Sequence, residues 1–152
     1  MAAPSAFIFF DKARLNFFSA TNLLNPANTY KLSLHTSTYV PSNSVHEVLA
    51  DVGNEIAAGN GYTAGGATLA NDALTLTGST VKFTTDATVF TAAGGSIPAW
   101  RYGVVYASGT LNGKVNPVVG YFLGDSAPAD VPATTVGNTL TITPNAAGIL
   151  TA

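Results

Sequence analysis

Alternation of apolar and polar residues predicts β-strands along most of the chain. Residues 80–84 and 139–143 alternate cleanly, which is typical of strands with one covered face. Residues 101–107 and 117–123 are apolar and nearly free of charge, so we expect them to pair, with 101–107 as a central strand. Shorter strands are expected at three places where Gly, Asn and Pro mark the turns, namely 67–77 (broken by a turn at 71–72), 88–90 and 148–152.

The segment 30–37 shows the same period of two. Leu32 and Leu34 alternate with Lys31, Ser33 and His35. The pattern predicts a half-buried strand whose leucines point inward and whose polar residues face solvent.

The N-terminal region has a different pattern. Residues 11–20 combine helix-forming residues with Asp11 at the start, where an acidic side chain stabilises a helix. A proline at position 26 ends this segment. We therefore expect one domain of the all-β class, an antiparallel β-sandwich of jelly-roll-like type (30–152), with an N-terminal arm and short helix (1–29) packed on it.

The composition narrows the possible functions. The 152 residues are 47% hydrophobic and only 9% charged, with a formal net charge of −2 and no cysteine. This balance argues against a nucleic-acid partner and against a polybasic membrane anchor. No apolar stretch reaches the length of a membrane-spanning helix. Disulfides and thiolate metal sites are excluded because they require cysteine.

The chain has two histidines, His35 and His46. A Ser-His-Asp hydrolase would have to use one of them, yet there is no G-x-S-x-G motif. We expect both histidines to face solvent and the protein to have no enzymatic activity, no cofactor and no metal. A hydrolase that combines a histidine with nearby carboxylates remains a minor alternative.

Glu47, Asp51 and Glu55 are four residues apart, so a helix would place them on one face. Three such carboxylates could bind a hard cation, and two could serve a glycosidase. Gly53 weakens the helix, and the Ca²⁺-loop pattern is missing. A solvated acidic face is the favoured interpretation, and cation binding stays open.

The glycine-rich segment 59–66 resembles a phosphate-binding loop only superficially. A dinucleotide site needs a helix after the loop, whereas a strand is predicted from Ala67 onward. Gly113–Lys114 is followed by Val115, so the P-loop pattern is absent as well. The glycines are expected to allow positive φ angles in turns.

The strongly apolar run at residues 7–10 requires a partner surface, either the protein's own core or a neighbouring molecule. Both alternatives are open, and the prediction is that deleting residues 1–10 leaves the domain folded while abolishing assembly. Trp100 is a second candidate anchor, because tryptophan is enriched at interfaces. The expected assembly interface comprises Phe7, Ile8, Phe9, Phe10 and Trp100.

Several segments, taken in order, resemble a widespread family of small tailed-bacteriophage virion proteins. The most specific is Gly61-Tyr-Thr-Ala-Gly-Gly66. The resemblance also rests on residues 23–25, 30–37, 39–41, 51–55, 67–69, 101–106, 117–121, 140–143 and 148–150.

This resemblance implies a structural, non-enzymatic role on the virion after synthesis in the host cytoplasm. The leading hypothesis is a capsid decoration or cement protein that binds the outside of the major capsid protein lattice. We also expect copies to associate with one another as dimers or trimers. The alternatives are a neck, tail or fibre-base component, and a carbohydrate-binding adhesion module with exposed rings at Trp100, Tyr102 or Tyr121.

Overall fold

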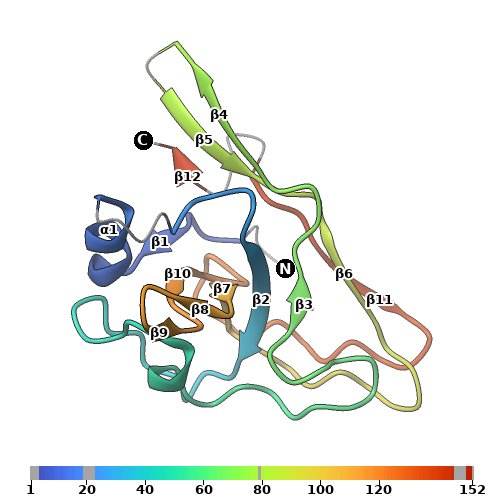
Figure 1. The fold of residues 1–152 in the computed structure, drawn as a ribbon. Helices are drawn as coiled ribbons and strands as arrows, with labels where there is room; N and C mark the ends of the chain where they lie inside the picture. Colours follow the sequence, from blue (N-terminus) through green and yellow to red (C-terminus); the bar gives the residue numbers. More distant parts are fainter. Residues whose placement is uncertain (1–3, 19–22, 79, 146–149, 152) are drawn as a thin grey trace.

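The computed structural model describes residues 4–18, 23–78, 80–145 and 150–151, and it shows an antiparallel β protein with one short α-helix (Figure 1). The helix α1 spans Asp11–Phe18, and a 3₁₀ turn, η1, spans Leu49–Asp51. The strands of the largest sheet, in spatial order, are β1 (Ile8–Phe9), β10 (Val118–Leu123), β7 (Tyr102–Ser108), β2 (Thr29–His35) and β3 (Ala67–Thr68). A three-stranded sheet consists of β12 (Leu150–Thr151), β5 (Thr80–Thr84) and β4 (Ala73–Thr77). Two further sheets have two strands each. One pairs β11 (Thr139–Ile142) with β6 (Thr88–Thr91), and the other pairs β8 (Thr110–Leu111) with β9 (Lys114–Val115).

Strand β7 lies at the centre of the main sheet, as predicted from its low charge. It pairs with β10 on one side and with β2 on the other, from Thr29↔Ser108 to His35↔Tyr102. Residues 103–107 are all buried. Strands covered on both faces form near-continuous apolar runs, and this explains the Val-Val-Tyr-Ala sequence of β7.

The ladder of β6 and β11 forms a second layer beside the main sheet (Figure 1). Both strands alternate between buried and exposed residues, so one face of the ladder is covered and the other is solvated. The covered face contributes Phe90, Leu140 and Ile142 to the core. The predicted all-β sandwich with one short N-terminal helix is therefore confirmed.

Residues 73–84 form the β4–β5 hairpin, which projects from the body of the protein (Figure 1). At its base Phe83 is buried and packs edge-to-face on Tyr30, with ring centroids 4.9 Å apart. Leu74, which pairs with Phe83, is 40% exposed, and Leu76, closer to the tip, is 69% exposed. The hairpin is thus anchored at its base, and the exposure of its leucines increases towards the tip.

Strand β2 differs from its predicted one-sided burial. Ser33 is 0% exposed and His35 is 1% exposed, so the positions expected to face solvent are buried. The reason is the following segment, residues 36–56, which folds back over this face of the sheet. Tyr39 from that segment packs on the ring of His35. A pattern of period two shows which residues share a face, but it does not show whether a distant loop covers that face.

The N-terminal segment packs on the protein's own core. Strand β1 is the edge strand next to β10, with Ile8 opposite Tyr121 and Phe9 opposite Gly120. Phe10 is 0% exposed, while Phe7 and Phe9 are partly buried against the core. This placement contradicts the expectation that residues 1–10 can be deleted from an intact domain, because the deletion removes a strand and a core side chain.

We therefore predict that Phe10→Ala lowers the free energy of unfolding by about 3–5 kcal/mol, the cost of deleting a fully buried phenylalanine. Leu15→Ala, on the exposed side of α1 and 64% exposed, is the matched control and should change it by no more than about 0.5 kcal/mol. Urea denaturation of both variants measures the difference. Equal stability of the two would mean that the N-terminal segment does not belong to the core.

Candidate functional site

A serine–histidine pair lies on β2. The Ser33 Oγ lies 2.9 Å from the His35 Nε2, and the His35 Nδ1 lies 2.9 Å from the carbonyl oxygen of Gly53. A carbonyl only accepts hydrogen bonds, so Nδ1 carries the proton and the Ser33 hydroxyl donates to Nε2. This is the geometry of a base next to a nucleophile. However, both side chains are buried, so the hydroxyl has no access to a substrate.

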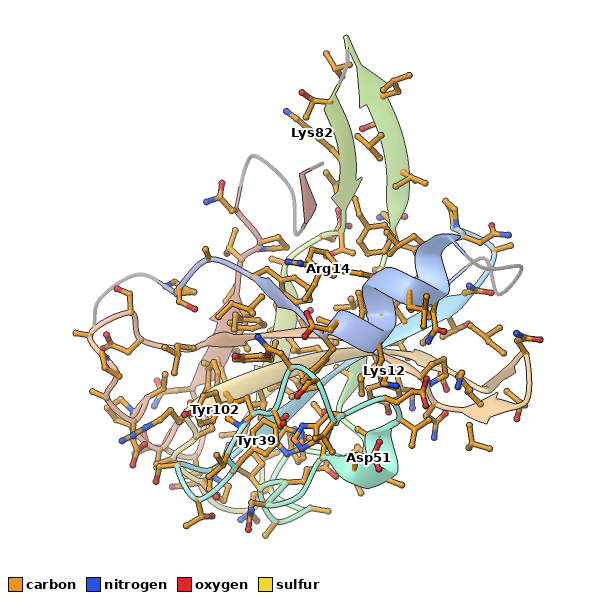
Figure 2. The ribbon with its side chains drawn as sticks, turned by 90° about the vertical axis from the view of Figure 1, so that its left-hand side faces the viewer. Lys12, Arg14, Tyr39, Asp51, Lys82 and Tyr102 are labelled. Carbon is orange, nitrogen blue, oxygen red and sulfur yellow. The ribbon has the colours of Figure 1, made fainter. Side chains whose placement is uncertain are left out.

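His46 lies in a closed circuit of aromatic rings over the same face of the sheet. Successive ring centroids are 5.3–6.3 Å apart around the circuit, which consists of Phe10, His46, Tyr39, Tyr102 and Tyr121. The Tyr39 hydroxyl lies 2.9 Å from the His46 Nδ1. This nitrogen also accepts the backbone N–H of Ser42 at 3.4 Å, so it carries no proton and the hydroxyl donates to it. Figure 2 shows Tyr39 next to Tyr102. The prediction that His35 and His46 face solvent is therefore wrong, and burial lowers the pKa of each below its usual value.

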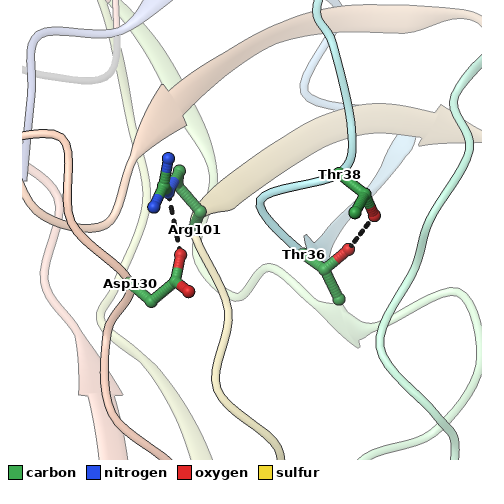
Figure 3. A network of polar contacts seen from close by, with 4 residues as sticks. All are labelled: Thr36, Thr38, Arg101 and Asp130. Atoms are coloured by element: carbon green, nitrogen blue, oxygen red, sulfur yellow. Dashed lines mark hydrogen bonds and ion pairs between the residues drawn. The ribbon is translucent and has the colours of Figure 1, made fainter.

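Short polar contacts hold the segments at the end of β2 (Figure 3). The Arg101 backbone N–H donates to the carbonyl oxygen of His35 at 2.8 Å, and the Arg101 side chain pairs with Asp130 at 2.8 Å. The hydroxyls of Thr36 and Thr38 lie 2.7 Å apart in the turn that leaves β2. These partly exposed contacts contribute little stability individually, but they fix the course of the chain around His35.

The three acidic residues spaced by four do not form a common site. Glu47 pairs with Lys114 at 2.7 Å. Asp51 accepts hydrogen bonds from the backbone N–H groups of residues 47 and 48, which lower its pKa. Glu55 accepts hydrogen bonds from the hydroxyl of Tyr62 and the N–H of Gly65. A helix would have aligned the three carboxylates on one face, but only a 3₁₀ turn forms here. Among the described residues, no group of three potential metal ligands is found.

The glycine-rich segment 59–66 has the positive φ angles that were predicted for its glycines, and it also connects two other segments of the chain. Tyr62 donates to Glu55 at 2.7 Å and accepts the N–H of Leu34 at 2.9 Å, so its hydroxyl bridges two segments. Burial is the main cause of the raised pKa of Tyr62. Gly66 has a φ of +77°, and a Cβ there would lie 1.8 Å from the carbonyl oxygen of Leu32. Glycine is thus required both for the backbone angle and for the close approach to β2.

The aromatic side chains considered for sugar binding do not form an exposed platform. Trp100 is 3% exposed and packs edge-to-face on Phe122. Tyr102 and Tyr121 are half-buried, and their planes are inclined by 66° to each other. Trp100 and Phe10 therefore have no surface for the anchoring role predicted for them. Phe7, Ile8 and Phe9 are half-buried by contacts within the chain.

The β4–β5 hairpin is the surface feature that the sequence interpretation missed. Leu74 and Leu76 alternate with threonines, and no charged residue occurs between Asp72 and Lys82. This absence of charge on a predicted strand was a signal available in the sequence. Within the described part of the chain, no helix is long and apolar enough to cross a membrane.

Comparison with known proteins adds no relative. The chain matches no protein-family model, and no curated protein or solved structure matches it significantly. The resemblance to tailed-phage virion proteins therefore stays a prediction.

Burial of His35 predicts acid sensitivity in a defined range. Its folded-state pKa lies below the value of about 6.5 expected in the unfolded chain. Below that pH the unfolded state binds more protons than the folded state, so stability falls as the pH falls. We expect the free energy of unfolding, measured by urea denaturation, to decrease between pH 7.5 and pH 5. His35→Asn should show a smaller decrease. A stability that is constant or rises over this range would contradict the neutral, buried state of the ring.

The close approach at Gly66 gives a second stability prediction. Gly66→Ala should destabilise the protein more than Gly109→Ala, because Gly109 also has a positive φ but a Cβ added there would meet no atom within 4 Å. The shared backbone strain costs about 1–2 kcal/mol, and we expect the clash with β2 to add roughly 1–3 kcal/mol. Thermal and urea denaturation of both variants give the comparison. Equal losses would show that the contact with Leu32 is unimportant.

Proposed function

We propose that this chain is a non-enzymatic structural protein of a tailed-bacteriophage particle and that it decorates the outside of the capsid, where it stabilises the major capsid protein lattice. The resemblance to tailed-bacteriophage virion proteins is the reason for proposing a phage particle. The observation that carries a structural role is the sparsely charged, partly apolar surface, above all the projecting β4–β5 hairpin with its exposed leucines (Figure 1).

The buried state of the candidate chemical groups supports a role without catalysis. The Ser33 hydroxyl and the ring of His35 are buried, the latter in contact with Tyr39 and Gly53, and His46 is 9% exposed. The carboxylates of Glu47, Asp51 and Glu55 each bind a different partner. The hydrolase alternative would need a histidine and a carboxylate together at an accessible surface, and this arrangement does not occur among the described residues.

A decoration protein acts through many copies that each make modest contacts. Because only 9% of the residues in the chain are charged, a neighbour can cover its surface at a small cost of desolvation, since few charges have to leave water. Weak contacts that are repeated over a regular lattice add up to a high avidity. Such a protein reinforces a shell without a single deep binding site.

The number of copies per particle tests this proposal against the neck, tail and fibre-base alternative. We expect quantitative mass spectrometry of purified virions that carry this chain to give a copy number comparable with that of the major capsid protein. The purified chain should also sediment with capsids that lack it. A copy number that is a small fraction of the capsid protein would favour the neck or tail, and absence from the virion would overturn the proposal.

The carbohydrate-binding alternative is not supported by the geometry. It requires an exposed and nearly flat aromatic surface, whereas Trp100 is buried and Tyr102 lies edge-to-face against Tyr39 and Tyr121.

A further inference from the structure

We propose that two copies of this chain associate through the outer edge of β4, which pairs antiparallel with β4 of the second copy about a two-fold axis through Thr75. Two β4–β5 hairpins would thereby form one continuous four-stranded sheet. The inference goes beyond the proposed function, because it concerns contacts between copies and does not depend on the particle.

Strand β4 is an unprotected edge. In the described sheet the spatial order is β12–β5–β4, so β4 has a neighbour on one side only. Edge strands of monomeric proteins are usually protected by charged residues, proline, a bulge or a covering segment. The sequence of β4, Ala-Leu-Thr-Leu-Thr, contains no charge and no proline, and its pairing with β5 is regular along all five residues. This edge can therefore accept another strand.

The hydrogen-bonding pattern of the hairpin selects the register. Two residues connect Thr77 to Thr80, so Thr77 and Thr80 form a hydrogen-bonded pair at the closed end. Pairs alternate along an antiparallel ladder, and the N–H and C=O groups of Leu74 and Leu76 consequently point away from β5. A two-fold axis at Thr75 places Leu74 opposite Leu76 of the second copy. The outward N–H and C=O groups of Leu74 in one copy then bond to those of Leu76 in the other copy, at both ends of the paired strands.

The same register matches the side chains. Residues directly opposite each other share a face, so four leucines from the two copies form one apolar strip. This strip continues over Val81 and Phe83, the partners of Leu76 and Leu74 on β5. On the other face threonine meets threonine at the axis. A second copy of this chain fits the edge because the strand is self-complementary.

The charges near the edge permit this pairing. Lys82 is opposite Thr75 on β5, so the two Lys82 residues of a pair are separated by three strand spacings, roughly 14 Å. This distance exceeds the screening length of about 8 Å at physiological salt. Asp72, which precedes β4, would face Gly78 of the other copy and not another acid.

The contact between the two strands buries little surface, and this limits the affinity. Two five-residue edges bury much less surface than the roughly 1,200–2,000 Å² of a stable complex. We therefore expect weak, reversible association of the free chain, which becomes effective where many copies are held side by side. A trapping experiment suits such an equilibrium better than a measurement of mass alone.

The absence of cysteine in this chain makes such an experiment specific. In the proposed pair the two Thr75 Cα atoms lie about 4.5 Å apart, within the range of about 4.4–6.8 Å that a disulfide spans. Thr75→Cys should form a disulfide-linked dimer under mild oxidation, scored by non-reducing electrophoresis. Thr77→Cys is the matched control, exposed on the same face of the same strand. Its two copies would lie roughly 14 Å apart, so we expect Thr75→Cys to link about tenfold faster or more.

A second pair of variants tests the apolar strip. Leu76→Lys in the Thr75→Cys background should slow the linking about tenfold, because each new ammonium would lie against leucines of the other copy and diagonally near its counterpart. Val89→Lys is the control, since Val89 is 53% exposed on β6, away from the hairpin. It should leave the rate unchanged.

Circular dichroism of every variant establishes that it is folded. The proposal is overturned if folded Thr75→Cys does not dimerise, if Thr77→Cys links at the same rate or faster, or if Leu76→Lys has no greater effect than Val89→Lys. Because only purified chain is used, any of these results leaves the copy number on virions, and so the proposed function, untouched.

Discussion

The fold depends on covering both faces and the outer edge of β2. Its polar face presents Ser33 and His35, which in a chain with so few charges must be satisfied by neutral hydrogen bonds. The two side chains bind each other, the carbonyl oxygen of Gly53 accepts from the His35 ring, and that of Val104 lies 3.4 Å from the Ser33 hydroxyl. Beyond the short β3, the backbone of Leu34 bonds to the hydroxyl of Tyr62 and to the N–H of Ile56. The loops of residues 36–66 are therefore positioned by the needs of one strand.

This constraint also explains why Ser33 and His35, residue types that suggest chemistry, are covered. Catalysis by a hydroxyl that donates to an imidazole also requires that a substrate can reach the hydroxyl. In this protein the same burial that orients Ser33 and His35 closes the approach to them. Burial lowers the pKa of both imidazoles and so favours their neutral form, and His46 is hydrogen-bonded by Tyr39. In this buried setting, the hydrogen bond between the two side chains serves to satisfy their polar atoms.

The sequence predicted the strands well and the site poorly, for a physical reason. Local signals define β5, β7 and α1, because alternation, low charge and a leading acid act within a few residues. His35 was assigned to solvent because the cover over it comes from Tyr39 and Gly53, whose return to β2 has no local signal. The spacing of Glu47, Asp51 and Glu55 suggested one face, but the backbone forms a single 3₁₀ turn there. The bond between Tyr62 and Glu55 could not be inferred from either residue alone.

The edges of the sheets connect the fold to assembly. The main sheet is protected at one edge by β1 of the N-terminal segment and at the other by β3 together with residues 54–62. Most β proteins also use lysines or acids for this purpose, but this chain has few to use. An uncharged strand that projects from the body, such as β4, must then be either a hazard or a contact. In a protein whose surface offers little electrostatic specificity, backbone pairing in a fixed register is one of the few devices that can define how copies meet. Low charge and an open edge are thus connected: the proposed pairing with a second copy would complete a sheet that the single chain leaves with an unpaired strand.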